Sequence, residues 1–304
     1  GKAGFFIFDN MSSLMFRKDV VKSELGSWDS VRFGADSEFV KRLQLVFGRK
    51  AVASIKTVPL SFQRQADTSL TGNKTFGYHG NFFGARLEYR QSQENYHSQK
   101  RSLYYPFPMR YRPFAVPEPM WPRREPGVNG VRHFDVVIAS EFRMRGGSVI
   151  SNIEEIKAHA RLGIRTGIVQ LARFDQNPNN TILPVVREVL DRGLAELLVY
   201  GESISCDLMI VRYPPSMLEQ LAFLLNVTAK EIRVIVNQPP MSDYGADGVF
   251  RYSIPEVQKN IAASFGRNIT WHPIGPLVRD ALTRRHKEDL DGINLSPVDW
   301  VNIV

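Results

Sequence analysis

Cysteine is almost absent from this sequence, since Cys206 is the only one among 304 residues. One cysteine cannot form an internal disulfide, which excludes the class of small secreted domains held together by disulfides and favours a reducing compartment. No apolar run approaches the roughly 18 residues of a membrane-spanning helix, and the first residues lack the pattern of a secretory signal. We therefore expect a cytoplasmic protein.

Several signatures of catalysis and metal binding are missing as well. The six histidines show no spacing typical of a zinc site, and the sequence has neither a Walker phosphate loop nor a serine-hydrolase elbow. Asp289 and Asp291 have the Asp-x-Asp spacing of many metal–diphosphate sites, but they follow an expected helix rather than a strand. We therefore predict no metal site in this sequence.

Positive charge is in excess: the formal net charge is +8, which favours anionic partners such as nucleotide diphosphates, acidic lipid surfaces or nucleic acid. Charge alone does not choose among them, and a solvated basic surface is the plain alternative. Arginines and aromatic residues interleave between residues 104 and 124, a pattern that either binds single-stranded nucleic acid or packs a linker onto its neighbours. Because no recognised nucleic-acid module accompanies it, we predict no nucleic-acid partner. Peripheral attachment to the inner face of a membrane is compatible with the charge.

Seven prolines lie between residues 106 and 126. Each proline removes a backbone donor and fixes φ, so this stretch is expected to be extended and semi-rigid. We interpret residues 101–131 as a connector between a first module, residues 1–100, and a second module, residues 132–304. The chain begins at Gly1 and stops where an apolar run begins, so we interpret it as a piece of a longer protein.

After the connector, short apolar runs alternate with helical patterns. The run 133–140 has little polar face, as in a strand that is buried on both sides. Strands that alternate with helices predict a doubly wound, mostly parallel α/β sheet, preceded here by a partial α/β segment. The expected strands are residues 133–140, 164–171, 195–200, 206–213, 231–238 and 268–274, and the expected helices are residues 148–162, 181–192, 255–265, 276–287 and one that begins near Pro214.

A glycine turn separates the first of these strands from its helix. Gly146 and Gly147 let a phosphate approach the backbone, and the helix that Ser148 or Ser151 opens presents free N–H groups and the positive end of its dipole. Arg145 adds positive charge beside the turn. Ligands of open parallel sheets bind beyond the carboxyl ends of strands, where this turn lies. The alternative is an ordinary strand-to-helix turn with a cap, because the six-position dinucleotide fingerprint is incomplete.

In the first module, two carboxylates stand at the start of a short amphipathic helix. Asp36 and Glu38 follow a glycine, and Phe39 and Leu43 continue one apolar stripe until Gly48 ends the helix. Carboxylates in this position are catalytic groups, metal ligands or only a helix cap. Spacing alone leaves these alternatives open.

The stretch 12–43 resembles the C-terminal part of a GT-A glycosyltransferase of the large inverting family. The resemblance covers roughly residues 5–95 and is carried by the sequences GSWD, residues 26–29, and ADSEF, residues 35–39. It implies that Asp36 is the catalytic base, with Ala35 where the family usually has a glutamate, and that Trp28, Asp29 and Glu38 bind the acceptor. The nucleotide-binding half of such an enzyme, with its metal site, would precede Gly1.

Residues 132–304 resemble the Rossmann-like N-terminal domain of a GT-B glycosyltransferase. This resemblance places Gly146, Gly147 and Ser148, with Arg145, at the phosphates of the sugar donor. Arg212 and Tyr213 stand where many retaining members have a histidine. The donor-binding second domain of such an enzyme would follow Val304.

The two resemblances imply an enzyme of the hexosyltransferase type, or a fragment of one. It would transfer a sugar from a nucleotide-diphosphate sugar to a glycan or cell-surface polysaccharide acceptor. No cofactor is expected within this sequence, because a divalent magnesium or manganese ion would belong to the missing GT-A donor half. The alternative is a non-catalytic scaffold module that binds a glycan or a partner within a larger glycosyltransferase. The sequence predicts no particular oligomeric state.

Overall fold

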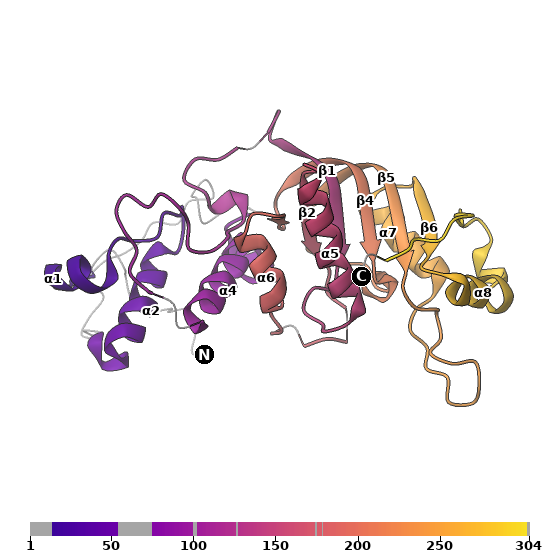
Figure 1. Cartoon of the computed structure of the whole chain (residues 1–304), viewed down its shortest axis with the longest axis horizontal. Coiled ribbons are helices and arrows are strands. Elements are labelled where there is room, and N and C mark those ends of the chain that lie inside the picture. The colour runs from indigo at the N-terminus through magenta and orange to yellow at the C-terminus, as the bar shows by residue number, and fades with distance from the viewer. Residues whose placement is uncertain are drawn as a thin grey trace, which may run out of the picture. The chain divides into compact units, whose positions relative to one another are not determined.

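The structure is a computed structural model that describes residues 14–53, 75–99, 102–125, 127–173, 175–177 and 179–302. The chain divides into two compact units, Gly1–Arg124 and Glu125–Val304. Figure 1 labels most helices and strands of both, and each unit is described by itself below. Among the described residues, no helix combines the length and the apolar character that crossing a membrane requires.

The second unit is built on a six-stranded sheet in which all paired strands are parallel. The strand order is β3-β2-β1-β4-β5-β6, so the direction of winding reverses between β1 and β4. The expected doubly wound parallel α/β fold is thereby confirmed. The strands are β1 Val131–Ser140, β2 Thr166–Gln170, β3 Glu196–Leu198, β4 Ser203–Arg212, β5 Asn226–Val236 and β6 Ile269–Pro273.

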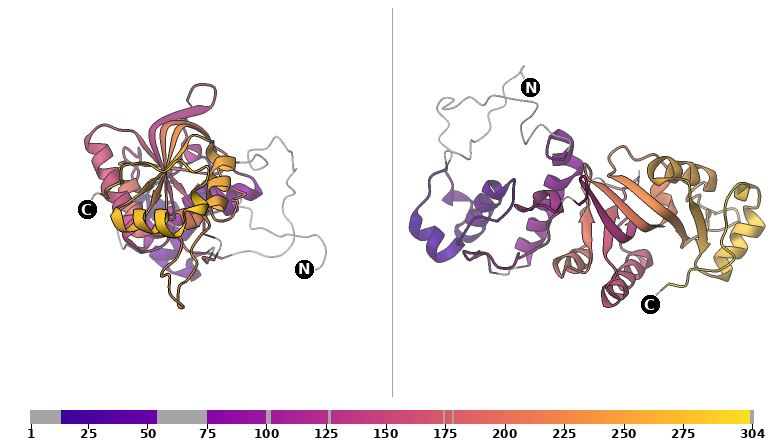
Figure 2. Two further views of the ribbon diagram at one scale, coloured as in Figure 1. Left: turned by 90° about the vertical axis from the view of Figure 1, so that its right-hand side faces the viewer. Right: turned by 90° about the horizontal axis from the view of Figure 1, so that it is seen from above.

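Helices cover both faces of this sheet, and this explains the apolar strands. Residues 136–139 of β1 are all buried, because a central parallel strand packs against helices on each side. Figure 2 places α5 and α6 on one face and α7 on the other. The helices are α5 Gly147–Arg161, α6 Pro184–Asp191, α7 Ile254–Phe265 and α8 Pro276–Arg285.

The prediction of a helix that begins near Pro214 is wrong. The chain forms only a short 3₁₀ turn, η5 Pro214–Met217, before it reaches β5. The side chain of Asn260, on α7, donates to the carbonyls of Met217 and Leu218 at 2.9 and 3.0 Å. Those carbonyls would accept the next backbone hydrogen bonds of a continuing helix. A tertiary contact therefore takes the acceptors that helix growth needs.

The C-terminal segment runs beside the outer edge of the sheet. Leu295 forms a parallel bridge with Trp271 of β6. The Trp271 N–H donates to the Asn294 carbonyl, the Ser296 N–H to the Trp271 carbonyl and the Trp300 N–H to the Pro273 carbonyl. Asn302 then accepts a hydrogen bond at 3.3 Å from Arg212, the last residue of β4.

The first unit is helical in its described part. The helix expected after Asp36 is confirmed as α2, which stops at Gly48, whose φ is 87°. Residues 54–74 lie outside the described residues. The helical elements are α1 Lys18–Val20, η2 Val21–Leu25, α2 Ala35–Phe47, η3 Arg49–Ala51, α3 Tyr78–Phe83, α4 Ala85–Ser98 and η4 Glu118–Met120.

Most of the proline-rich segment packs within the first unit. Tyr105 and Phe114 are buried, and the Phe114 ring lies 6.1 Å from that of Tyr89 and 5.5 Å from that of Tyr96. Gly26 meets this segment so closely that an added Cβ would lie 1.9 Å from the Tyr105 carbonyl oxygen. Several aromatic residues of the segment therefore serve packing, which is the second of the two readings that its composition allowed.

Candidate functional site

Asp36 lines a cavity in the first unit. The side chain stands in the first turn of α2, and its Oδ1 accepts a hydrogen bond from the Ser37 N–H at 2.7 Å. Gly34, with φ 74°, makes the turn that precedes the helix, and an added Cβ there would lie 3.2 Å from the Tyr89 ring. The cavity measures about 440 Å³ and is lined by Trp28, Val31, Arg32, Phe33, Gly34, Ala35 and Asp36.

Trp28 shares this cavity and presents a flat aromatic surface. Its ring stacks on that of Phe39 with centroids 4.3 Å apart and planes 18° apart. Phe39 is fully buried, whereas Trp28 keeps 36% of its surface exposed. The buried ring therefore fixes the orientation of the exposed indole. Two of the four sequence-predicted residues of the first unit, Asp36 and Trp28, are thus brought together.

Asp29 points away from the cavity, into the interior. Its side chain is fully buried, both carboxylate oxygens lie 2.9 Å from Nη2 of Arg112, and Oδ2 accepts from the Tyr89 hydroxyl at 2.9 Å. Burial, with the Asp29 charge beside it, raises the pKa of the Tyr89 phenol well above its usual range. Asp29 therefore holds the turn that carries Trp28.

Glu38 is also an interior residue. Its side chain has no exposed surface, and its Oε1 lies 2.7 Å from Nε of Arg42 and 3.1 Å from Nε2 of His97. Arg42 is buried too and donates to the carbonyls of Leu25, Ser27 and Leu103. Glu38 and Asp29 thus do not line the cavity, and both act in the frame behind it.

In the second unit, the glycine turn lies at the carboxyl end of β1, beside the point where the winding reverses. Gly146 precedes α5 with φ 165° and ψ 173°, and α5 begins at Gly147. A Cβ added at either glycine would meet no atom of the described residues within 4 Å. Neither the backbone conformation nor the packing demands glycine here. The turn therefore leaves open space in front of the first N–H groups of α5, with Ser148 half-buried and Arg145 exposed beside it.

Three buried polar side chains lie in the segments around this turn, and sequence reasoning missed them. Ser140 ends β1, Asn152 lies in the second turn of α5, and Ser216 follows β4; all are at most 2% exposed. Within the described part of the chain, the hydroxyls and both amide atoms of these side chains have no hydrogen-bond partner. Unpaired buried polar groups are costly, and they concentrate where a protein meets water or a ligand.

A polar network joins the loops that follow β1, β2 and β4. Glu141 accepts from the Gln170 amide at 2.6 Å and from the Arg173 N–H at 3.1 Å. The guanidinium of Arg173 donates to the Tyr213 hydroxyl at 2.7 Å. These loops come from separate stretches of the sequence, so the spacing gave no signal for the network. It fixes the loops around the switch point in one arrangement.

Beneath α5, an ion pair is buried. Arg212, at the end of β4, donates to Glu155 of α5, and both residues are almost wholly buried. Burial raises the pKa of Glu155 although Arg212 acts in the opposite direction. Breaking one side of such a pair leaves an uncompensated charge in the interior. Arg212, which stands where the resemblance led to a histidine, therefore has a structural partner.

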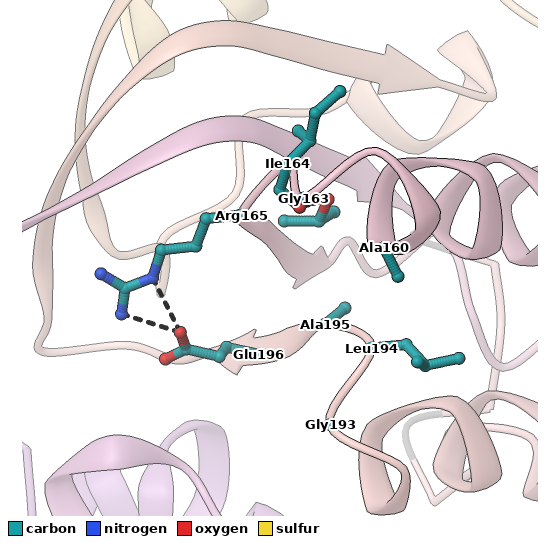
Figure 3. Close-up of a pocket in the computed structure, with 9 residues that line it drawn as sticks. Ala160, Gly163, Ile164, Arg165, Gly193, Leu194, Ala195 and Glu196 are labelled. Carbon is teal, nitrogen blue, oxygen red and sulfur yellow. Dashed lines mark hydrogen bonds and ion pairs between the residues drawn. The ribbon is translucent and has the colours of Figure 1, made fainter.

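A second cavity, of about 340 Å³, lies at the amino ends of β2 and β3 (Figure 3). The glycine turn follows the carboxyl end of β1, at the opposite edge of the parallel sheet. Nε and Nη2 of Arg165 both donate to Glu196 Oε1, at 2.9 and 2.8 Å. Arg132 binds the other oxygen of Glu196. Residues at the carboxyl ends of α5 and α6 line this cavity, and the negative end of a helix dipole disfavours a phosphate.

The described residues hold one group of three side chains with metal-ligand geometry. Ligand atoms of His133, Asp135 and Asp207 all lie within 4.8 Å of one another. Sequence spacing did not indicate this group, because it spans β1 and β4. Nζ of Lys230 already lies 2.6 Å from Oδ1 of Asp207, so its ammonium group competes with any cation there.

No protein-family model matches the chain, and no curated protein matches it.

Proposed function

We propose that the chain is a two-module glycosyltransferase, or a piece of one, that acts on a nucleotide-diphosphate sugar and a glycan acceptor. In this proposal the second unit receives the donor diphosphate at the glycine turn. In the first unit, and in a reaction separate from that at the glycine turn, Asp36 is the base that takes a proton from an acceptor hydroxyl. Both substrates belong to the cytoplasm, where such a donor would be supplied.

The glycine turn is the observation that carries the proposal. Gly146 and Gly147 are not required by their backbone angles or by packing, and open space lies before them at the switch point of a parallel sheet. A phosphate that approached there would meet the free N–H groups and the positive dipole end of α5. Ser140 is the last residue of β1, and its buried hydroxyl has no hydrogen-bond partner among the described residues.

The chemistry required of this turn is stabilisation of negative charge. In sugar transfer, the bond between the anomeric carbon and the diphosphate breaks, and the diphosphate leaves with the electron pair. N–H groups held in place before the reaction stabilise that charge without reorganisation. Arg145 is exposed beside the turn and adds positive charge.

The cavity of the first unit supports the second part of the proposal. Asp36 is only partly buried, and the Oδ1 hydrogen bond to Ser37 leaves its second oxygen for an acceptor hydroxyl. A carboxylate within hydrogen-bond reach can take the proton as the hydroxyl attacks the anomeric carbon. Direct attack with one base inverts that carbon. The indole of Trp28 offers a flat apolar surface on which a sugar ring can pack.

Titration of the full chain with uridine diphosphate tests the donor site, with isothermal calorimetry as the measurement. We expect binding, and we expect Gly146→Val to weaken it about tenfold or more, because the new side chain fills the space that the phosphate needs. Stability should stay unchanged, since a Cβ at Gly146 touches nothing and valine accepts extended backbone.

Gly275→Val is the matched control. Gly275 also precedes a helix, has φ 170° and ψ 177°, and has no atom within 4 Å of an added Cβ. It follows β6 instead of β1, so its replacement should leave binding as it is. Equal affinity of the wild type and Gly146→Val for uridine diphosphate would show that the diphosphate does not bind at this turn.

A further inference from the structure

A hairpin that follows β5 carries an exposed tyrosine. Met241 and Phe250 form an antiparallel bridge, and the Arg251 N–H donates to the Pro240 carbonyl at 2.8 Å. Figure 1 shows this hairpin as the long orange loop that extends from β5. Near its tip, Tyr244 keeps 40% of its surface exposed. The proposed glycosyl transfer assigns this hairpin no role.

Tyr244 belongs to a chain of three hydrogen-bonded side chains. Its hydroxyl lies 3.1 Å from Nε2 of His286, the residue that caps α8. Nδ1 of His286 lies 2.9 Å from Oδ2 of Asp289. The three groups thus form a line from carboxylate to imidazole to phenol.

The carboxylate of Asp289 determines which atoms of His286 and Tyr244 act as hydrogen-bond donors. Ionised Asp289 only accepts hydrogen bonds, so Nδ1 of His286 carries the proton that it shares with Asp289. In a neutral imidazole the other nitrogen, Nε2, is then an acceptor. The phenol of Tyr244 must therefore be the donor, and its proton points at a base. A nucleophile, a base in contact with it and a third group that orients the base form the recognised arrangement for activating a hydroxyl.

Two arginines, Arg285 and Arg251, lie near the phenol of Tyr244. The guanidinium carbon of Arg285 lies 5.6 Å from the centre of the Tyr244 ring. Burial raises the pKa of the Tyr244 phenol, and Arg285 and Arg251 oppose that rise. The phenol therefore keeps its proton at neutral pH, and its reactivity depends on His286 taking that proton during the step.

We propose that Tyr244 is an activated nucleophile that accepts an acyl or phosphoryl group from an anionic donor. His286 is its general base, Asp289 positions that base, and Arg285 attracts the donor. This site is independent of the glycosyl transfer proposed above, because it uses none of the same residues.

The step conserves atoms and charge. Oη of Tyr244 forms a bond to the electrophilic atom, and the bond between that atom and its leaving group breaks. The leaving group departs with the electron pair, and the phenolic proton passes to Nε2 of His286. No oxidant or reductant is involved.

Labelling of the full chain with 4-(fluorosulfonyl)benzoate, an anionic sulfonyl fluoride, tests the proposal. Mass spectrometry gives the labelling rate at each tyrosine. Tyr104 is the internal reference, because it is 43% exposed and, among the described residues, its hydroxyl has no hydrogen-bond partner. We expect Tyr244 to react about 100-fold faster than Tyr104, the usual scale of general-base assistance. Equal rates at the two tyrosines would overturn the proposal.

Variants separate a base from a residue that merely holds the hairpin. His286→Ala should lower the rate at Tyr244 to that of Tyr104, and free imidazole should restore it by supplying the missing base. Asp289→Asn should slow labelling about tenfold, whereas Asp289→Glu should keep most of it. A rate unchanged by His286→Ala, or one that imidazole fails to restore, would contradict the role of His286.

The preference for an anionic donor has its own test. 4-(Fluorosulfonyl)benzamide has nearly the same size as the benzoate but no charge. We expect the benzoate to label Tyr244 about fivefold faster than the benzamide, and Arg285→Gln to abolish that difference. Equal labelling rates of Tyr244 with the two reagents in the wild type would show that the site does not prefer an anionic donor.

Discussion

Arg42→Met should unfold the first unit, with a loss of about 3–5 kcal/mol in its free energy of unfolding. The Arg42 side chain is fully buried, pairs with the equally buried Glu38 and donates to three backbone carbonyls. Its guanidinium also lies 3.7 Å from the centre of the Tyr105 ring. Methionine fills a similar volume but leaves a carboxylate and three carbonyls without their partner.

Hydrogen exchange followed by mass spectrometry measures this effect for each unit separately. Peptides from α2 and α4 should lose their protection in the variant, whereas peptides from β1 and β4 should keep it. Lys41→Met is the matched control, because the Lys41–Glu94 pair is exposed and such pairs contribute little. Protection of α2 equal to that of the wild type would show that the Glu38 pair is not needed for this unit.

In the full-length enzyme, Asp36→Asn should lower sugar transfer by about 100-fold to 10,000-fold, the range of general acid–base catalysis. Asparagine keeps the size of the side chain and an oxygen that can accept the Ser37 N–H, but it cannot take a proton from an acceptor. Stability should change little, because asparagine and aspartate are similar at the start of a helix. Release of nucleoside diphosphate from a panel of nucleotide sugars, with mixed glycan acceptors, measures the rate.

Asp19→Asn is the control for this variant. Asp19 is an exposed carboxylate in the first turn of α1, paired with Arg17 and absent from the lining of the cavity. Its replacement should leave transfer unchanged. Sugar transfer by Asp36→Asn at the wild-type rate would show that Asp36 is not the catalytic base.

The fold of the second unit was predictable because its signals are local. The apolar run at residues 136–139 reads as a doubly buried strand, and each helix begins near a glycine, serine or proline that can start it. The prediction of a helix near Pro214 failed because the deciding contact is not local. Its growth is stopped by Asn260, whose amide bonds to a carbonyl 43 positions earlier, and no pattern within residues 214–225 contains that information.

In the candidate sites too, features that depend on sequence neighbours were predictable and those that depend on distant contacts were not. The place of Asp36 at a helix start follows from its neighbours in the sequence, whereas the burial of Asp29 and Glu38 does not. Asp29 meets Arg112, which is 83 positions away, and Glu38 meets His97, which is 59 positions away. The Tyr244–His286 contact joins positions 42 apart. Partners at such separations are set by the packing of whole elements, which spacing and propensity do not encode.

We expect the segment that runs beside β6 to protect the protein from aggregation as well. A sheet edge with free N–H and C=O groups is a template onto which another chain can add a strand. One edge strand, β3, has only three residues, and the outer backbone of β6 is occupied by residues 294–300. A chain shortened before Asn294 would retain all six strands and yet expose the backbone of β6, and we expect it to self-associate.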